Sequence, residues 1–319
     1  MLQQTQVATV IPYYLKFLRA FPTLKKLAQA PLERVLELWS GLGYYRRARN
    51  LHAAARVVSR KFGGRIPADY HQARSLPGVG DYTARAILSI AYQQPFAVMD
   101  GNVSRVVARL KTLRGSINQP RFRLAVEQDL ERLLSLRKPG NFNQALMELG
   151  QTVCLPRAPR CSVCPIQNWC MAYRLKKPEA YPAPRPHRTT ELHHLATAVI
   201  RRRSRLVLIR GLDSGLLPDL WNFPAAFGST RAAALRHLQE KLSALTGGGA
   251  DAVEIRPPFA EIRHTITHRS IRVHVYPAEV RGNVMSNSVK WFTPARLGRS
   301  AVSQLARKIS AILAPGMRS

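Results

Sequence analysis

The chain has 319 residues, and its 49 Lys and Arg against 18 Asp and Glu give a formal net charge of +31. This length predicts two domains, and a hydrophobic content of 46% excludes a wholly disordered chain. No apolar run approaches the roughly 20 residues of a membrane span, which excludes a transmembrane protein. Residues 1–14 lack the basic and apolar regions of a secretory signal, so we expect a cytoplasmic protein.

The positive charge is spread along the whole chain. Residues 1–170 carry 25 basic and 9 acidic residues, and residues 171–319 carry 24 and 9. This distribution excludes a neutral enzyme with a basic tail. A polyanionic partner, most simply nucleic acid, explains it better than an Arg-rich background that only aids solubility.

In chain order, the first half shows helical patterns and the second half shows strand patterns. Residues 174–188 between them are rich in Pro and basic residues, which is typical of an extended linker. Apolar residues at helical spacing predict helices over residues 10–21, 31–38, 53–62, 83–92, 122–136, 230–245 and 301–313. Apolar runs and polar–apolar alternation predict strands over residues 196–200, 206–209 and 262–276. We therefore expect a multi-domain protein with an all-α domain followed by an α+β domain.

All the cysteines of the chain lie in one short segment. They are Cys154, Cys161, Cys164 and Cys170, with the spacing C-x6-C-x2-C-x5-C. Four thiolates in one loop predict a metal or cluster site. A structural zinc site usually has two C-x-x-C pairs, and here only one such pair exists. The spacing thus favours a 4Fe–4S cluster over zinc and leaves both open.

A glycine-rich turn separates two predicted helices at residues 76–84, LPGVGDYTA. Gly78 and Gly80 permit tight backbone geometry, and Asp81 or Thr83 can cap the following helix. Backbone N–H groups and a helix N-terminus in such a turn make an anion site that suits a DNA phosphate. The alternative is an ordinary turn between helices.

Five segments, taken in this order with the cysteine loop, resemble a known family over the whole chain. They are MLQQTQV at 1–7, GLGYYRRARNLH at 41–52, LPGVGDYTARAIL at 76–88, DGNV at 100–103 and FNQALMELG at 142–150. The resemblance is to the endonuclease III-like superfamily of helix–hairpin–helix DNA glycosylases, and most of all to its adenine DNA glycosylase (MutY-type) branch.

The resemblance implies a domain plan and a reaction. It implies a helix–hairpin–helix glycosylase domain over 1–172 with a 4Fe–4S loop at 154–170, a linker over 173–192 and a Nudix-like α+β domain over 193–319. The expected reaction is base-excision repair, in which adenine mispaired with 8-oxoguanine or guanine is released by hydrolysis of its N-glycosidic bond. The expected partner is mispaired double-stranded DNA, bound by a monomer at the bacterial nucleoid.

Asp100 matches the carboxylate that stabilises positive charge on the sugar in this family, and Asn102 matches a residue that orients it. The alternative for Asp100 is a helix N-cap. In the hairpin, Gly78, Val79 and Gly80 would grip phosphate.

Further residues match family positions at the base and in the duplex. Leu2, Tyr82 and Glu148 would line the pocket of the flipped adenine, whereas Glu148 could also be a surface charge. Gln3, Gln4 and Tyr44 would wedge into the duplex, with core packing as the alternative for Tyr44. We expect Arg46, Arg47 and Arg49 to meet phosphates or solvent.

The C-terminal segment resembles the Nudix-like domain that checks for 8-oxoguanine. Thr267 and His268 match its recognition loop, whereas Ile266 replaces an aromatic residue of the family. The helix at 230–245 has one Glu, so we do not expect Mg²⁺-dependent Nudix hydrolysis.

Two alternatives remain for the function. Lyase relatives carry a Lys after the glycine-rich turn, where this chain reads Asp81-Tyr82, so an endonuclease III-type pyrimidine glycosylase is disfavoured.

The family's glutamate that protonates adenine precedes the position of Met1, and Glu33 and Glu37 do not replace it. A start assigned too far downstream, a truncated inactive 4Fe–4S DNA-binding protein and a different acid are the competing explanations. We expect little base release from these 319 residues alone.

Overall fold

The computed structural model describes residues 1–3, 5–183, 191–246, 252–266, 269–281 and 288–313. By its internal contacts the chain forms two compact units, Met1–Arg56 with Arg188–Ser319, and Val57–His187. The first 56 residues are thus grouped with the C-terminal part. The expected domain limits at 172 and 193 stay a prediction.

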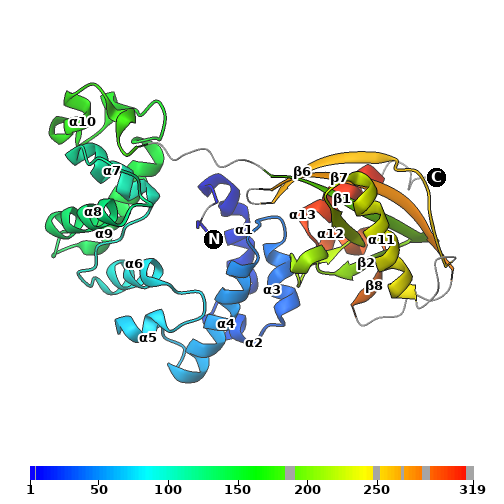
Figure 1. Cartoon of the computed structure of the whole chain (residues 1–319). Coiled ribbons are helices and arrows are strands. Elements are labelled where there is room, and N and C mark those ends of the chain that lie inside the picture. Colours follow the sequence, from blue (N-terminus) through cyan, green and yellow to red (C-terminus); the bar gives the residue numbers. More distant parts are fainter. Residues whose placement is uncertain (4, 184–190, 247–251, 267–268, 282–287, 314–319) are drawn as a thin grey trace. The chain divides into compact units, whose positions relative to one another are not determined.

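The first half of the chain is helical, as expected (Figure 1). Its α-helices are α1 (Val7–Ala20), α2 (Leu24–Gln29), α3 (Leu32–Trp39), α4 (Arg46–Lys61), α5 (Tyr70–Arg74), α6 (Asp81–Tyr92), α7 (Gly101–Lys111), α8 (Pro120–Leu133), α9 (Pro139–Thr152) and α10 (Met171–Arg174). Short 3₁₀ turns are η1 (Cys161–Val163), η2 (Gln167–Trp169) and η3 (Pro178–Ala180). Pro120 and Pro139 begin α8 and α9, where a missing backbone N–H leaves no helical bond unmade.

In the unit Val57–His187, α7 packs against α8 and α9 around an apolar core that includes Val103, Val107 and Val126. The close approach of α9 to α7 requires a glycine. A Cβ at Gly150 would lie 2.7 Å from the Cβ of Asn102, so no larger residue fits there without displacement. This packing brings the start of α7 beside the end of α9.

The second half folds into one mixed sheet with helices, which confirms the expected α+β class. Its strands are β1 (Glu191–Arg202), β2 (Arg205–Arg210), β3 (Trp221–Asn222), β4 (Ala225–Gly228), β5 (Val253–Ile255), β6 (Ala260–Ile266), β7 (Arg269–Val280) and β8 (Val289–Phe292). Its helical segments are η4 (Asp213–Gly215), α11 (Arg231–Thr246), α12 (Pro294–Arg299) and α13 (Gln304–Leu313).

The sheet has the order β3-β2-β1-β7-β5, with β4, β6 and β8 paired to β1, β7 and β2. The long central strands β1 and β7 run parallel, and the other pairs are antiparallel. Helix α11 covers one face through Leu238 and Leu242, and α13 covers the other through Leu305 and Ile309 (Figure 1). The alternating side chains of β1 and β7 therefore separate into two apolar layers.

The alternating segment 262–276, within which the family's recognition loop is expected, contains parts of two strands. The structure divides it into β6 and β7, which pair antiparallel from Ala260↔Val275 to Ile266↔Arg269. Polar–apolar alternation continues through both strands of a hairpin, so the pattern alone does not reveal the reversal.

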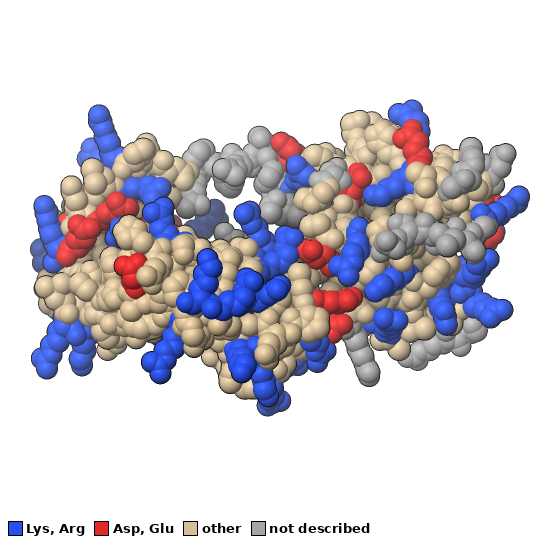
Figure 2. Space-filling view, turned by 90° about the horizontal axis from the view of Figure 1, so that it is seen from below, with Lys and Arg blue, Asp and Glu red and all other residues tan. Residues whose placement is uncertain are grey.

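No helix in the described ranges combines the length and the apolar character that a membrane crossing requires. Lys and Arg side chains are scattered over the face in Figure 2, where Asp and Glu are few. The surface thus reflects the net charge of +31.

Candidate functional site

Asp100 lies at the N-terminus of α7 and caps it. Its Oδ1 accepts hydrogen bonds from the backbone N–H of Asn102 at 2.8 Å and of Val103 at 2.7 Å. Within the described chain, Oδ2 has no hydrogen-bond donor, and the residue is only half-buried. The cap therefore fixes the carboxylate and leaves one oxygen for another task. Both interpretations of Asp100 are compatible with this geometry.

Asn102 orients Asp100 through its backbone, because its side chain has a different partner. The Oδ1 of Asn102 accepts a hydrogen bond from Arg105 at 2.9 Å. The Arg105 guanidinium also donates to the carbonyls of Gly150 at 2.6 Å and Cys154 at 2.8 Å. Arg105 therefore connects the first turn of α7 with the end of α9 and the start of the cysteine loop.

Arg109 holds the same loop from one turn further along α7. It is 2% exposed, and its guanidinium donates to the carbonyls of Leu155 at 2.6 Å, Pro156 at 3.0 Å and Tyr181 at 3.0 Å. It also donates to the Sγ of Cys154 at 3.2 Å. One helix thus presents Asp100 at its start and two arginines that bind the cysteine loop.

Two of the four cysteines, Cys161 and Cys164, have thiols with a raised pKa. Burial raises the pKa of the Cys161 thiol, and the charges of the three other cysteines raise it further. Burial likewise raises the pKa of Cys164. The described residues contain no group of three or more His, Cys, Asp or Glu side chains already arranged around a metal ion. The donor set, four thiols beside a guanidinium, nevertheless has the chemistry of a cluster site.

Tyr82 and Glu148 lie on α6 and α9. The Tyr82 hydroxyl donates to the Sδ of Met147 at 3.5 Å. Burial raises the pKa of Tyr82, and the negative charge of Asp100 raises it further, so Tyr82 lies within electrostatic range of Asp100. The Glu148 side chain is exposed and has no ion pair within the described chain. Tyr82 thus lies close enough to Asp100 to respond to its charge. The roles of Tyr82 and Glu148 in the base pocket stay predictions.

The glycine-rich turn joins α5 to α6 and exposes its backbone. Gly78 has φ +76°, which a residue with a Cβ rarely adopts, and Val79 packs against the apolar cluster below the turn. Gly80 is the N-cap of α6 and provides no side-chain cap. The expected cap by Asp81 is wrong, because the Asp81 carboxylate instead binds Tyr70 and Arg85, whereas the expected cap by Thr83 stays a prediction.

The side chain of Asp81 is therefore turned to its own neighbours. The hydrogen bond from Tyr70 lowers the pKa of Asp81, and the bond and charge of Arg85 lower it further. Because the N-cap residue Gly80 has no side chain, the N-terminus of α6 suits an anion.

Arg47 has a structural role that sequence analysis missed. It was expected to meet phosphate or solvent, but its guanidinium donates to the carbonyl of Met1 at 2.7 Å, the carbonyl of Gln3 and the Oγ1 of Thr5 at 3.0 Å. It also lies 5.1 Å from the ring centre of Tyr44. Burial lowers its pKa. Arg47 therefore ties residues 1–5 to the turn that carries Tyr44.

Two side chains of this N-terminal group are exposed: Leu2, which was expected in the base pocket, and Tyr44, which was expected to wedge into the duplex. Leu2 is 58% exposed and Tyr44 is 50% exposed, with φ +49° at Tyr44. The alternative of core packing for Tyr44 is wrong, whereas its neighbour Tyr45 is buried. Gln4, Thr267 and His268 lie outside the described residues, so their roles stay predictions.

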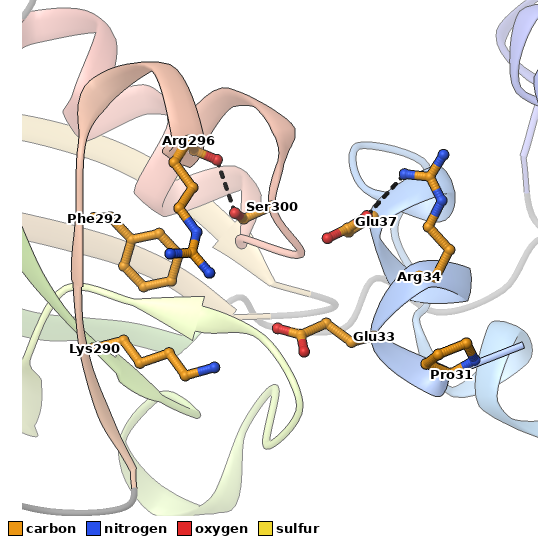
Figure 3. A pocket seen from close by; sticks show the side chains of 8 residues that line it. All are labelled: Pro31, Glu33, Arg34, Glu37, Lys290, Phe292, Arg296 and Ser300. Carbon is orange, nitrogen blue, oxygen red and sulfur yellow. Dashed lines mark hydrogen bonds and ion pairs between the residues drawn. The ribbon is translucent and has the colours of Figure 1, made fainter.

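A cavity of ≈ 260 Å³ lies where α3 meets β8 and α12 (Figure 3). Glu33 and Glu37 line it, but neither is a free acid. Glu33 accepts a hydrogen bond from the Trp221 Nε1 at 3.4 Å, and Glu37 pairs with Arg34 at 2.9 Å. The cavity contains none of the predicted site residues.

Comparisons with known proteins agree with the order of these features. Residues 1–134 match the model of the HhH-GPD superfamily of base excision DNA repair proteins, and residues 196–311 match the NUDIX domain. The rat adenine DNA glycosylase is 32% identical over 97% of this chain and 69% of its own length. This chain belongs to the adenine DNA glycosylase family. Its fold is accordingly a helix–hairpin–helix glycosylase domain joined to a Nudix-like domain.

A second relative and one solved structure are similar to this chain over different extents. The human adenine DNA glycosylase is 33% identical over 97% of this chain and 66% of its own length. A thermostable thymine-DNA glycosylase structure is 29% identical, with a TM-score of 0.48 over 55% of this chain and 80% of that one. The chain spans about two thirds of the length of its mammalian relatives.

Sequence analysis did not single out Arg105, Arg109 or Asn143. Asn143 is fully buried; it accepts from the N–H of Val98 at 3.1 Å and donates to the carbonyl of Phe96 at 2.8 Å. It therefore fixes the extended segment that leads to Asp100. For Asn143, the only signal in the sequence was a polar residue on an otherwise apolar helix face.

Proposed function

We propose that this chain provides the DNA-binding and sugar-stabilising site of a monofunctional DNA glycosylase for adenine mispaired with 8-oxoguanine or guanine. The proposal rests on the carboxylate of Asp100. Its Oδ1 accepts two backbone hydrogen bonds, and its Oδ2 has no hydrogen-bond donor within the described chain. When the N-glycosidic bond breaks, both bonding electrons leave with adenine and positive charge develops on the sugar. A fixed carboxylate stabilises that charge without having to reorganise.

Water completes the reaction at the sugar carbon, and adenine takes up a proton as it leaves. No lysine stands at the start of α6, where lyase relatives carry one, and the Tyr82 hydroxyl forms no Schiff base. The proposed product is therefore an intact strand with an abasic site. The exposed backbone of Gly78–Gly80 would hold a phosphate of the same strand.

We also propose that Cys154, Cys161, Cys164 and Cys170 hold a 4Fe–4S cluster. The Arg109 guanidinium would donate to the Cys154 sulfur and offset the negative charge of the bound cluster. Such a cluster supplies a rigid, redox-capable cross-link of the loop. Iron and acid-labile sulfide analysis of the purified protein tests this, and stoichiometric zinc instead of iron would overturn it.

Binding tests the glycosylase proposal without depending on base release. We expect the full chain to bind duplex DNA with a cationic pyrrolidine abasic analogue opposite 8-oxoguanine at least about 100-fold tighter than a neutral tetrahydrofuran analogue, as transition-state analogues do. The preference should be weaker opposite cytosine than opposite 8-oxoguanine. Equal affinity for the cationic and neutral analogues would indicate a DNA-binding protein without a catalytic site.

A further inference from the structure

Three neighbouring strands of the Nudix-like sheet present a row of basic side chains. The register pairs Arg263 of β6 with Arg272 of β7, and Arg272 with His194 of β1. Paired residues of adjacent strands point to the same face of the sheet, so these three side chains share one face. This is the face on which α11 packs. We call this group the cationic row; Arg263 and Arg272 carry its charge, whereas the His194 ring stacks on His274, with its Nδ1 3.1 Å from the His274 Nε2.

The row has few negative neighbours. Arg263 and Arg272 are exposed and form no ion pair with any described residue. On this face the carboxylate of Glu261 lies 3.5 Å from the His274 Nδ1, two residue pairs further along the β6–β7 ladder. Like charges that face each other across a ladder are destabilising when nothing compensates them. The row is therefore a surface that gains from an added anion.

The first turn of α11 adjoins the end of the row. His194 pairs with Gly228, and a side chain at Gly228 would collide with the backbone of Ala234. Arg231, the first residue of α11, binds the Tyr276 hydroxyl at 3.3 Å. Burial lowers the pKa of His274, and the charges of Arg231 and Arg272 lower it further against the opposing effect of Glu261. The positive charges on this face therefore act on His274, which lies on the same face.

The row also adjoins the hairpin that is expected to read the lesion. Arg263 and Arg272 stand three residues from the last pair of the ladder, Ile266↔Arg269. At about 3.4 Å per residue, that separation is about 10 Å along the strands. Duplex DNA carries one phosphate charge per about 1.7 Å of helix axis, so a duplex bound at the hairpin would present several phosphates within that distance.

We propose that the cationic row binds backbone phosphodiesters of the DNA duplex beside the base that the hairpin reads. This inference rests on the proposed function, because it requires that the chain bind duplex DNA. The row adds affinity without sequence information, while base contacts come from elsewhere. Its contribution is electrostatic and falls as salt concentration rises.

The test uses the full chain and a duplex with a neutral abasic analogue opposite 8-oxoguanine. The variant is R263Q/R272Q, and the matched control is R202Q/R205Q, which removes two exposed arginines paired across the β1–β2 ladder. The dissociation constant is measured over a series of KCl concentrations. Each lost phosphate contact lowers the slope of log K against log salt by about 0.9, so we expect a loss of about 1.8 for R263Q/R272Q and a much smaller change for the control.

The possible outcomes distinguish the proposal for the cationic row from the proposed glycosylase function. Equal slopes for the two double variants would overturn the cationic row while leaving the proposed glycosylase intact. Wild-type protein that does not bind the duplex would overturn both. Calorimetric binding of inorganic phosphate that R263Q/R272Q abolishes, together with unchanged DNA slopes, would assign the row to a free anion and contradict the DNA assignment. Unfolding in urea provides a folding control, because removing facing like charges should leave stability unchanged or raise it.

Discussion

Arginine has different roles on α7 and on the Nudix-like sheet. On α7, the guanidinium of Arg109 is buried and satisfies three backbone carbonyls of the cysteine loop and its surroundings. On the sheet, Arg263 and Arg272 are exposed and have no ion pair with the described residues. The net charge of +31 therefore includes charges that stabilise the fold and charges that remain available for a partner.

This difference determines what a substitution should cost. Loss of a buried guanidinium leaves several acceptors without donors, and its cost does not depend on DNA. Loss of an exposed arginine barely changes stability but weakens salt-sensitive binding. The variants below test that division, from the largest expected effect to the smallest.

Substitution of Arg109 should have the largest effect on stability. R109A removes donors from Leu155, Pro156 and Tyr181, so we expect the free energy of unfolding to fall by about 3 kcal/mol or more. Urea unfolding with linear extrapolation measures the change. R174Q is the control, because exposed Arg174 makes one bond to the Asn168 carbonyl and should cost under about 1 kcal/mol. Equal losses of unfolding free energy in R109A and R174Q would contradict the division between buried and exposed arginines.

Arg47 should have an intermediate effect that is confined to the N-terminal residues. R47Q removes the donors to Met1, Gln3 and Thr5, and we expect a loss of about 1–2 kcal/mol. Amide hydrogen exchange of residues 1–5 should accelerate. R46Q, at the exposed neighbouring position, should leave exchange unchanged. Slow exchange in R47Q would show that another contact holds the segment.

The lowered pKa of His274 predicts that the stability of the fold depends on pH. Burial lowers its pKa in the folded chain below the usual value of 6.5. The unfolded chain therefore binds more protons between the two pKa values, and stability falls as pH decreases below about 6.5. Urea unfolding at pH 7 and pH 5.5 should show a smaller decrease for H274Q than for the wild type. An unchanged pH dependence would contradict this assignment.

The ion pair between Arg49 and Asp219 should have the smallest effect. The two side chains lie 2.5 Å apart, and both are about one-third exposed or less. Partly exposed pairs contribute little, so a double-mutant cycle with R49Q and D219N should give a coupling energy under about 1 kcal/mol. Added salt should reduce it further. A larger coupling that persists in salt would show that the pair is shielded from solvent.

The sequence predicted the fold class because its signals were local. Helical spacing, the linker composition and the cysteine spacing each lie within a short window. The alternation over 262–276 did not by itself show where β6 ends and β7 begins, because it continues through both strands. Arg105 and Arg109 were missed because most of their partners are backbone carbonyls 45 to 72 residues away along the chain, which carry no residue-specific signal.

Asp100 shows how far the sequence could decide a role. The motif DGNV predicted both a cap and a catalytic carboxylate, and the structure places the cap on one oxygen only. Asparagine and aspartate cap helices about equally well. Substitution by asparagine therefore separates the two roles, because it keeps the cap and removes the charge.

The most direct test is the preference for the cationic abasic analogue in D100N and D100A. If Asp100 stabilises positive charge at the sugar, D100N should retain the stability of the wild type and lose the preference by about 100-fold, since an opposing charge at close range contributes several kcal/mol. D100A should lose the same preference and about 1 kcal/mol of stability as well. A D100N protein that retains the wild-type preference would show that Asp100 is only a helix cap.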